Sequence, residues 1–232
     1  MILLDEVFII LTKQSGYPRM RLGLIGGTFD PVHYGHLVAA EEARYELGLS
    51  KVVFVPAGQP PHKPDRHISP AFHRVAMVRL ALASNPHFEL STMEVERSGP
   101  SYTVDTVKEF RYLYDRAEIW FITGADAVLE ILAWYRAEEL FRLCRVVAAA
   151  RPGYSLNGLS ERLAPLGDLR ERIDVLKVPG VAVSSTEIRE RVKAGKPIKY
   201  LLPEAVEEYI ILHKLYLNTG DTPHTQAVER YR

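Results

Sequence analysis

The chain has 232 residues, and its 29 lysines and arginines balance 29 aspartates and glutamates, so its formal net charge is zero. Apolar residues make up 47% of the chain, which is typical of a globular domain and excludes a disordered or fibrous protein. The balanced charge disfavours a general nucleic-acid binder, because such proteins carry an excess of lysine and arginine.

The composition also predicts the cellular setting. No apolar run approaches the roughly 20 residues that a membrane-spanning helix needs, so we expect no membrane partner. Residues 1–16 begin with apolar side chains, but Asp5 and Glu6 stand where a signal peptide carries positive charge. The single cysteine, Cys144, cannot form an internal disulfide. These features together predict a cytoplasmic protein.

Short apolar runs rich in β-branched residues alternate with segments of helical period along most of the chain. The predicted strands are Arg21–Ile25, Val52–Val55, Phe88–Leu90, Ile119–Thr123, Val146–Ala149 and Ile173–Val178. The predicted helices are Gly35–Leu47, Pro70–Ala83, Thr103–Tyr114, Ala127–Leu143, Ser185–Ala194 and Pro203–Leu215. This alternation predicts an α/β, Rossmann-like parallel sheet with helices on both faces, whose ligands bind beyond the carboxyl ends of the strands.

The same pattern predicts a single domain over residues 20–217 that finishes with a C-terminal helix. Residues 1–19 are interpreted as an N-terminal extension. Residues 218–232 are polar and show no sustained apolar period, so we expect a flexible tail.

The first predicted strand runs directly into a glycine-rich turn, GGTFDPVHYGH, over residues 26–36. Gly26 and Gly27 allow the backbone to approach a phosphate closely. The helix that follows offers the positive end of its dipole and N–H groups without helical partners. The turn is therefore interpreted as a nucleotide-binding turn.

Two histidines lie in this turn at a spacing of three residues. On a first helical turn, His33 and His36 share one face, where their imidazoles can donate hydrogen bonds to phosphoryl oxygens. In the alternative interpretation, Asp30-Pro31 forms only a turn and the histidines serve packing. Two histidines behind a glycine-rich strand end favour the functional interpretation.

Other phosphate-binding and hydrolase motifs do not fit the chain. The G-x-G-x-x-G fingerprint is absent after the first strand, which disfavours a dehydrogenase. The only Gly-Lys pair, Gly195-Lys196, is followed by proline and does not form a P-loop. Neither G-x-S-x-G nor H-E-x-x-H occurs, which excludes the usual serine hydrolase and zinc protease signatures.

Four further segments follow predicted strands. The loop GQPPHK over residues 58–63 places Lys63 where it could neutralise a phosphate, and His62 could bind substrate or brace the loop. Ser101 or Thr103 could cap the helix that starts near residue 103, and Trp134 on a helical segment would ordinarily pack in the core. The turn Gly124-Ala125-Asp126 follows the fourth strand.

The last of these segments, SSTEIR over residues 184–189, opens a helix for which Ser185 or Thr186 is a suitable N-cap. Arg189 then lies one turn inside the helix. Residues 185–199 hold five lysines and arginines against two glutamates, an excess of three positive charges that could bind a triphosphate. Arg191 and Lys193 can equally belong to a solvated face.

The turn at residues 26–36 resembles the T/H-x-G-H signature of the nucleotidyltransferase superfamily, and the segments above resemble bacterial nicotinate-nucleotide adenylyltransferases over most of residues 21–213. His33 helps to distinguish this family from the phosphopantetheine adenylyltransferases, which carry a threonine at that position. The resemblance implies adenylyl transfer from ATP to nicotinate mononucleotide, which gives nicotinate adenine dinucleotide and pyrophosphate in NAD synthesis.

The resemblance also implies roles for individual residues. The catalytic residues it implies are His33, His36 and Arg189. The ATP-binding residues it implies are Gly26, Gly27, Thr28, Phe29, Gly124, Asp126, Ser185 and Thr186. The acceptor-binding residues it implies are His62, Lys63, Tyr102, Thr103 and Trp134, with the tryptophan stacking on the pyridine ring. We expect Mg²⁺ to arrive on the triphosphate and no metal-ligating residue, because no carboxylate cage is evident.

Two alternatives stay open at this point. An adenylyl- or cytidylyltransferase with another phosphate acceptor would share the T/H-x-G-H turn, which concerns only the triphosphate half. A non-catalytic nucleotide-binding module would keep the fold without turnover. The sequence also leaves open whether the chain is a monomer or a homo-oligomer.

Overall fold

The computed structural model describes residues 19–59, 68–150, 161 and 163–217. Within them, the strands are β1 (Arg21–Gly27), β2 (Lys51–Pro56), β3 (Phe88–Leu90), β4 (Glu118–Gly124), β5 (Arg145–Ala150) and β6 (Ile173–Lys177). All pair in parallel in one sheet of order β3-β2-β1-β4-β5-β6. The predicted α/β parallel sheet is confirmed, and each strand lies within two residues of its predicted bounds.

Helices connect the strands. They are α2 (Tyr34–Glu46), α3 (Ala71–Leu82), α4 (Met93–Glu96), α5 (Thr103–Leu113), α6 (Ala125–Val128), α7 (Ala137–Leu143), α9 (Ser185–Lys193) and α10 (Glu204–Leu212). Two 3₁₀ segments, η1 (Ile131–Ala133) and η2 (Ala164–Arg172), complete the described elements. The predicted C-terminal helix is present as α10, but it ends three residues before its predicted end at Leu215.

The prediction of one helix over residues 127–143 is wrong. The chain forms α6, η1 and α7 there, because Trp134 is extended (ψ 146°) and Arg136 adopts a left-handed conformation (φ 55°). The apolar side chains of Val128, Ile131 and Leu140 are nevertheless buried in one cluster. The helical period therefore reported which side chains are buried and did not show that the helix is continuous.

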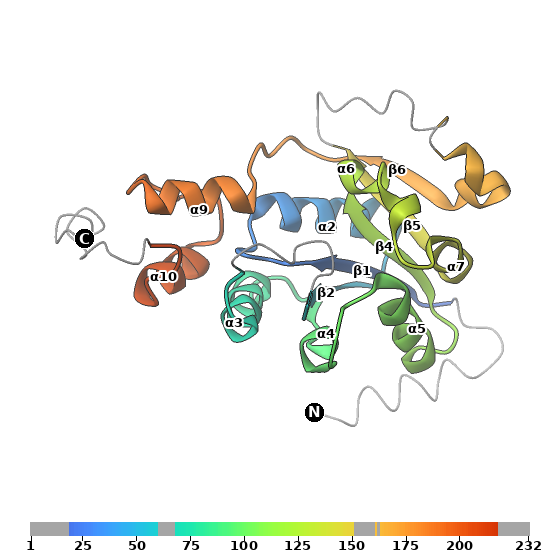
Figure 1. Cartoon of the computed structure of the whole chain (residues 1–232), viewed down its shortest axis with the longest axis horizontal. Helices are drawn as coiled ribbons and strands as arrows, with labels where there is room; N and C mark the ends of the chain where they lie inside the picture. Colours follow the sequence, from blue (N-terminus) through green and yellow to red (C-terminus); the bar gives the residue numbers. More distant parts are fainter. Residues whose placement is uncertain (1–18, 60–67, 151–160, 162, 218–232) are drawn as a thin grey trace.

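Both faces of the sheet are covered. Side chains alternate along a strand, so that Val52 and Phe54 of β2 pack on one face while Val53 and Val55 pack on the other. Residues of α2, α3, α9 and α10 share the first cluster, and residues of α5, α6 and α7 share the second. Helices α2 and α5 lie on opposite sides of the sheet (Figure 1), which confirms the predicted layers.

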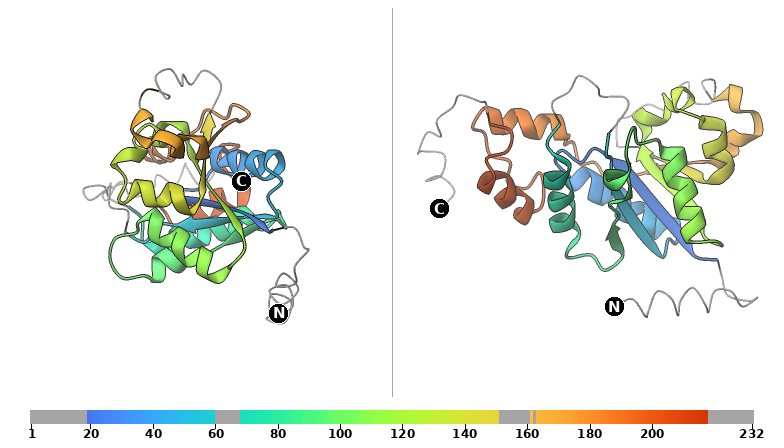
Figure 2. Two further views of the ribbon diagram at one scale, coloured as in Figure 1. Left: turned by 90° about the vertical axis from the view of Figure 1, so that its right-hand side faces the viewer. Right: turned by 60° about the horizontal axis from the view of Figure 1, so that its bottom comes forward.

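The strand order fixes where a ligand can bind. β1 lies between β2 and β4, and the chain moves outward from β1 to β3 before it returns to β4. The carboxyl ends of β1 and β4 therefore flank a topological switch point, which is the usual ligand site of open α/β sheets. Helices α9 and α10 lie together at one end of the molecule and α7 lies at the other (Figures 1 and 2).

The predicted extension over residues 1–19, apart from Arg19, and the predicted tail over residues 218–232 fall outside the described residues. The bounds of the predicted domain thus stay a prediction. No helix among the described residues is both long and apolar enough to cross a membrane.

Candidate active site

The turn after β1 brings the two histidines together at the start of α2. His33 is the N-cap residue with an extended backbone, and its N–H donates to Nδ1 of His36 at 3.3 Å. A neutral His36 therefore carries its proton on Nε2. The two rings stack with centroids 3.8 Å apart, so the imidazoles share one face as their spacing predicts. The first turn of α2 has no acidic side chain that would offset the positive end of the helix dipole.

Phe29 supports this pair from below. Its side chain is 2% exposed. The centroid of its ring lies 5.1 Å from that of His36, in a T-shaped arrangement, and 5.7 Å from that of Phe54. Gly27 permits the arrangement, since a Cβ there would lie 3.1 Å from the Phe29 ring. The side chain of Phe29 thus belongs to the core, and we infer that it serves the predicted ATP site by holding His36.

Helix α9 docks on the same turn. Arg189 donates from Nη1 to the backbone oxygen of Asp30 at 2.7 Å and from Nη2 to Oγ1 of Thr186 at 3.3 Å. Ser185 donates from Oγ to the backbone oxygen of Pro31 at 2.8 Å. These contacts bring together the two histidines and Arg189, although Arg189 is 159 residues from Asp30 in the sequence.

The predicted N-cap of α9 is wrong by one residue. Ser184, not Ser185 or Thr186, caps the helix by accepting a hydrogen bond from the N–H of Glu187 at 3.1 Å. The hydroxyl of Ser185 is instead used to dock α9 on the β1–α2 turn. A sequence with two adjacent serines offers two equivalent caps, and only the contact with Pro31 distinguishes them.

Backbone contacts connect this turn to the segments predicted to bind the acceptor. The N–H of Ala57, after β2, donates to the oxygen of Gly27 at 2.8 Å. The N–H groups of Gly58 and Gln59 donate to Oγ of Ser101 at 3.1 and 3.2 Å. Ser101 is therefore not the helix cap that the sequence suggested, and it ties the β2 loop to the start of α5.

Helix α5 begins at Thr103, after Tyr102 in the N-cap position, and neither Ser101 nor Thr103 caps it. Tyr102 makes no side-chain cap bond, so the first turn of α5 relies on other partners for its N–H groups. Glycine is required at position 58, because a Cβ there would lie 2.0 Å from the backbone oxygen of Glu94. The close approach of these two backbones brings α4 and α5 beside the β2 loop.

Aromatic side chains gather next to the start of α5. The rings of Tyr102 and Tyr135 lie 4.4 Å apart, and the neighbouring Trp134 meets Phe121 of β4 edge-on at 5.9 Å. Trp134 is half-buried and follows η1 in an extended conformation, so its predicted place on a helix is wrong. Its contact with the second core cluster agrees with the packing role that the sequence also allowed.

The turn after β4 lies beside the turn after β1, since these two strands are neighbours. Gly124 ends β4, and Asp126 lies in the first turn of α6. A Cβ at Gly124 would meet Oδ1 of Asp126 at 2.3 Å, so the glycine allows the carboxylate to fold back over the strand end. His62 and Lys63 fall outside the described residues.

Sequence reasoning missed a buried arginine under the site. Arg74 of α3 is 2% exposed and donates to three backbone oxygens: Nε to Ser69 at 3.0 Å, Nη1 to Thr28 at 2.9 Å, and Nη2 to Gly58 at 3.4 Å. Burial lowers the pKa of Arg74, and the nearby Asp30 carboxylate opposes that effect. A signal was present, because the apolar positions 77, 78 and 81 place Arg74 on the buried face of its helix.

Two buried carboxylates were also missed. Asp30 is 4% exposed, and its Oδ1 accepts from the hydroxyl of Tyr216 at 2.7 Å while its Oδ2 accepts from the N–H of Ser69 at 3.1 Å. Glu94 is 6% exposed and accepts from Oγ1 of Thr106 at 2.5 Å. Burial raises the pKa of Glu94, and the hydrogen bond from Thr106 opposes the rise.

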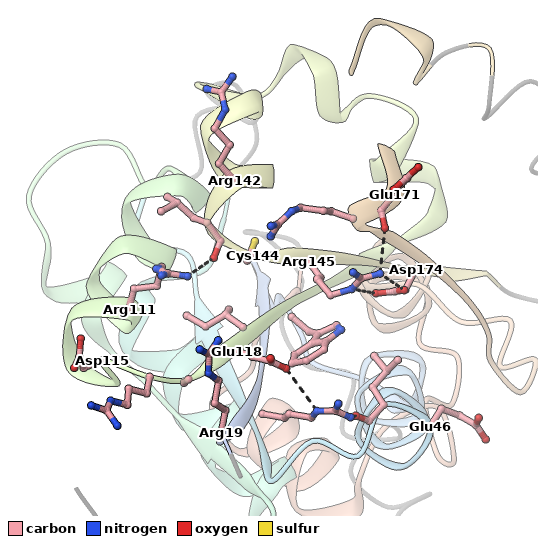
Figure 3. Close-up of a pocket in the computed structure, with 18 of the residues that line it drawn as sticks. Arg19, Glu46, Arg111, Asp115, Glu118, Arg142, Cys144, Arg145, Glu171 and Asp174 are labelled. Atoms are coloured by element: carbon pink, nitrogen blue, oxygen red, sulfur yellow. Dashed lines mark hydrogen bonds and ion pairs between the residues drawn. The ribbon is translucent and has the colours of Figure 1, made fainter. Parts of the chain in front are cut away.

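A groove at the opposite, amino edge of the strands is rich in arginine (Figure 3). Two of its arginines bind helix C-termini: Arg21 donates to the oxygen of Leu47 at 3.1 Å, and Arg111 to that of Leu143 at 2.9 Å. Arg145 forms a bidentate pair with Asp174. Cations at helix C-termini offset the negative end of the dipole, so Arg21 and Arg111 have a structural role in the fold.

No group of three or more histidines, cysteines, aspartates and glutamates is placed to hold a metal ion within the part of the chain that the structure describes. Cys144 is buried at the end of α7, and burial raises its thiol pKa to about 12. At the carboxyl edge, the imidazoles of His33 and His36 and the guanidinium of Arg189 supply hydrogen-bond donors that suit a polyphosphate.

The family model described as cytidylyltransferase-like matches residues 24–191. A probable nicotinate-nucleotide adenylyltransferase of Moorella thermoacetica is 57% identical over 198 residues, which cover 84% of this chain and 91% of that protein. A protein of the same name from Thermoanaerobacter sp. is 54% identical over 199 residues, which cover 85% of this chain and 94% of the relative.

A similar fold occurs in a solved structure, that of Plasmodium falciparum nicotinic acid mononucleotide adenylyltransferase complexed with NaAD. The TM-score is 0.70 at 18% identity, and the match covers 85% of this chain and 98% of the other. At this low identity the likeness concerns the fold, and it agrees with the Rossmann-like sheet described above.

Proposed function

This chain belongs to the cytidylyltransferase-like family and, within it, to the nicotinate-nucleotide adenylyltransferases, and on that basis we propose that it joins ATP and nicotinate mononucleotide. The products are nicotinate adenine dinucleotide and pyrophosphate, in a step of NAD synthesis. One structural observation carries the proposal: His33, His36 and Arg189 gather on one turn at the carboxyl end of β1.

The reaction needs alignment more than covalent chemistry. A phosphate oxygen of the mononucleotide attacks the α-phosphorus of ATP, and the bond from that phosphorus to the bridging oxygen of pyrophosphate breaks. The attacking group is already nucleophilic, so the protein has to align it and offset the charge that develops on the phosphoryl oxygens. This requirement explains a site of imidazoles and a guanidinium without a catalytic triad.

The triphosphate half is assigned to the β1–α2 turn and to α9. Nδ1 of His36 accepts from the N–H of His33, so the imidazole carries its proton on Nε2. We assign this Nε2–H as a hydrogen-bond donor to a phosphoryl oxygen. Arg189 has five N–H donors, of which the contacts with Asp30 and Thr186 use two, and the others are assigned to the outer phosphates. Ser185 would hold α9 in place through its hydrogen bond to the backbone oxygen of Pro31.

The acceptor half is assigned to the start of α5 and the aromatic cluster. A nicotinate carboxylate suits the positive end of a helix dipole, which Thr103 and Tyr102 provide here. The indole of Trp134 would stack on the pyridine ring, as an aromatic plate suits a flat heterocycle. Gly124 and Asp126 are assigned to the nucleotide, and His62 and Lys63 to the acceptor phosphate.

ATP would enter as its magnesium complex, with the ion held by phosphate oxygens and water. In this assignment the imidazoles of His33 and His36 and the guanidinium of Arg189 would contact phosphate oxygens, and the ion would stay with the substrate. A cytoplasmic location is part of the same proposal, because the reaction consumes ATP.

The test uses the full chain with magnesium, ATP and nicotinate mononucleotide, and it measures pyrophosphate and the dinucleotide product. Parallel reactions replace the acceptor by nicotinamide mononucleotide or phosphopantetheine, and ATP by CTP. We expect the highest kcat/KM with ATP and nicotinate mononucleotide. Turnover only with another acceptor, or with CTP, would assign the chain to a different transferase, and binding of ATP without turnover on any acceptor would support a non-catalytic module.

A further inference from the structure

The chain turns back on itself after α10 and returns to the phosphate-binding turn. Lys214 and Tyr216 both adopt left-handed backbone conformations, with φ of 52° and 66°, which residues other than glycine rarely adopt. This backbone path places the Tyr216 hydroxyl 2.7 Å from Oδ1 of Asp30, a residue 186 positions earlier in the sequence. A strained path that ends on a buried carboxylate of the site indicates a contact with a purpose beyond packing.

Asp30 connects Tyr216 to the residues assigned to ATP. Its carboxylate binds Tyr216 through Oδ1 and the N–H of Ser69 through Oδ2, and its backbone oxygen accepts from Arg189. His33 lies three residues further along the same turn. A shift of Asp30 would therefore move both the partner of Arg189 and the start of α2.

Arg74 completes the arrangement from the other side. Ser69 is held at both polar groups of its backbone, since its N–H donates to Asp30 and its oxygen accepts from Arg74. Arg74 also binds the oxygen of Thr28 within the turn. Burial, followed by the Asp30 charge, raises the pKa of Tyr216 far above its usual range, so its hydroxyl stays a donor at all working pH values.

We propose that Tyr216 is a positioning residue for adenylyl transfer: by fixing the Asp30 carboxylate, it holds the turn that presents His33, His36 and the partner of Arg189 to the triphosphate. This inference rests on the proposed function and adds a residue outside every motif in the sequence. It predicts that the hydroxyl of Tyr216 affects the ATP half of the reaction and leaves the acceptor half unchanged.

The test compares Tyr216→Phe with Tyr209→Phe. Tyr209 is the matched control, because its hydroxyl lies 2.9 Å from Nδ1 of His73 on α3 and, among the described residues, no hydrogen bond joins it to the phosphate-binding turn. The measured quantities are kcat, KM for each substrate, the dissociation constant for ATP and the midpoint of thermal unfolding. Assays run well below the unfolding temperature, so that a loss of stability alone does not change the kinetics.

We expect Tyr216→Phe to lower kcat/KM for ATP by about tenfold, because a turn that is no longer fixed at Asp30 aligns the triphosphate less accurately, with KM for nicotinate mononucleotide unchanged. Tyr209→Phe should stay within about twofold of the wild type. Equal kinetics for the two variants, or a Tyr216→Phe effect confined to the unfolding midpoint, would overturn the inference.

A double-mutant cycle with Asp30→Ala, which removes the acceptor of the Tyr216 hydroxyl, tests the route. If Tyr216 acts through Asp30, adding Tyr216→Phe to Asp30→Ala should cost less than about threefold further, whereas fully additive losses would contradict the inference. Failure of the proposed function is recognised separately, as absence of turnover in the wild type. In that case the ATP dissociation constant decides, because Tyr216→Phe should still weaken ATP binding relative to Tyr209→Phe.

Discussion

Replacement of Arg74 by methionine removes a buried cation while keeping an unbranched side chain of similar length. The wild-type guanidinium donates to the oxygens of Ser69, Thr28 and Gly58, two of them at 2.9–3.0 Å and one at 3.4 Å. A hydrogen bond from a charged donor contributes about 1.5–3 kcal/mol, and the cost of burying the guanidinium offsets part of the sum. We expect Arg74→Met to lower the free energy of unfolding by about 3–5 kcal/mol, because three carbonyls and the Asp30 carboxylate lose a buried partner.

The assay is urea unfolding followed by circular dichroism, with Arg79→Met as the matched control. Arg79 lies on the same helix but is exposed, so its replacement should change the free energy of unfolding by less than about 0.5 kcal/mol. The same loss should lower the melting temperature of Arg74→Met by roughly 10 °C for a chain of this size. If Arg74→Met and Arg79→Met unfold at the same urea concentration, the reasoning about the buried guanidinium is wrong.

Three further predictions address the site. His36→Ala should lower kcat by about 10²–10³ with an unchanged circular dichroism spectrum, and a loss below threefold would contradict its assigned role. Trp134→Ala should raise KM for nicotinate mononucleotide about tenfold and Trp134→Phe less, with KM for ATP constant; equal effects on both substrates would exclude stacking on the acceptor. The pKa of Glu94 is raised on folding, so its contribution to stability is present below about pH 4.5 and is lost as pH rises through the folded value. Unfolding measured from about pH 4.5 to pH 7 should therefore show the wild type losing stability relative to Glu94→Gln, and a constant difference would refute the buried titration.

The sheet was predictable because its central strands, β1, β2, β4 and β5, are buried on both faces. Such strands give continuous apolar runs, and the carboxyl ends of parallel strands share one edge, so the sequence alone predicts that the segments after β1, β2 and β4 lie at that edge. Over residues 127–143 the period did not predict the backbone, since periodic burial is also compatible with a helix interrupted at Trp134 and Arg136.

Local chemistry was less predictable than the motifs suggested. Neighbouring hydroxyls are equivalent in a sequence, so the cap of α9 and the task of Ser101 were decided by contacts with Pro31 and with the β2 loop. Asp30 read as a turn residue, although its carboxylate is buried and bonded to Tyr216. These roles depend on partners more than 40 residues away, which a local pattern does not contain.

The sequence by itself determined the α/β architecture, the pairing of His33 with His36 and the family resemblance, because periodicity, spacing and motifs are properties of short stretches of chain. Tertiary structure alone decided that Arg189, Arg74 and Tyr216 meet one turn, since three distant segments reach it only after the sheet, α3, α9 and α10 have packed. Hydrogen bonds act over about 3 Å, so which residues make them is settled by folding and not by order along the chain.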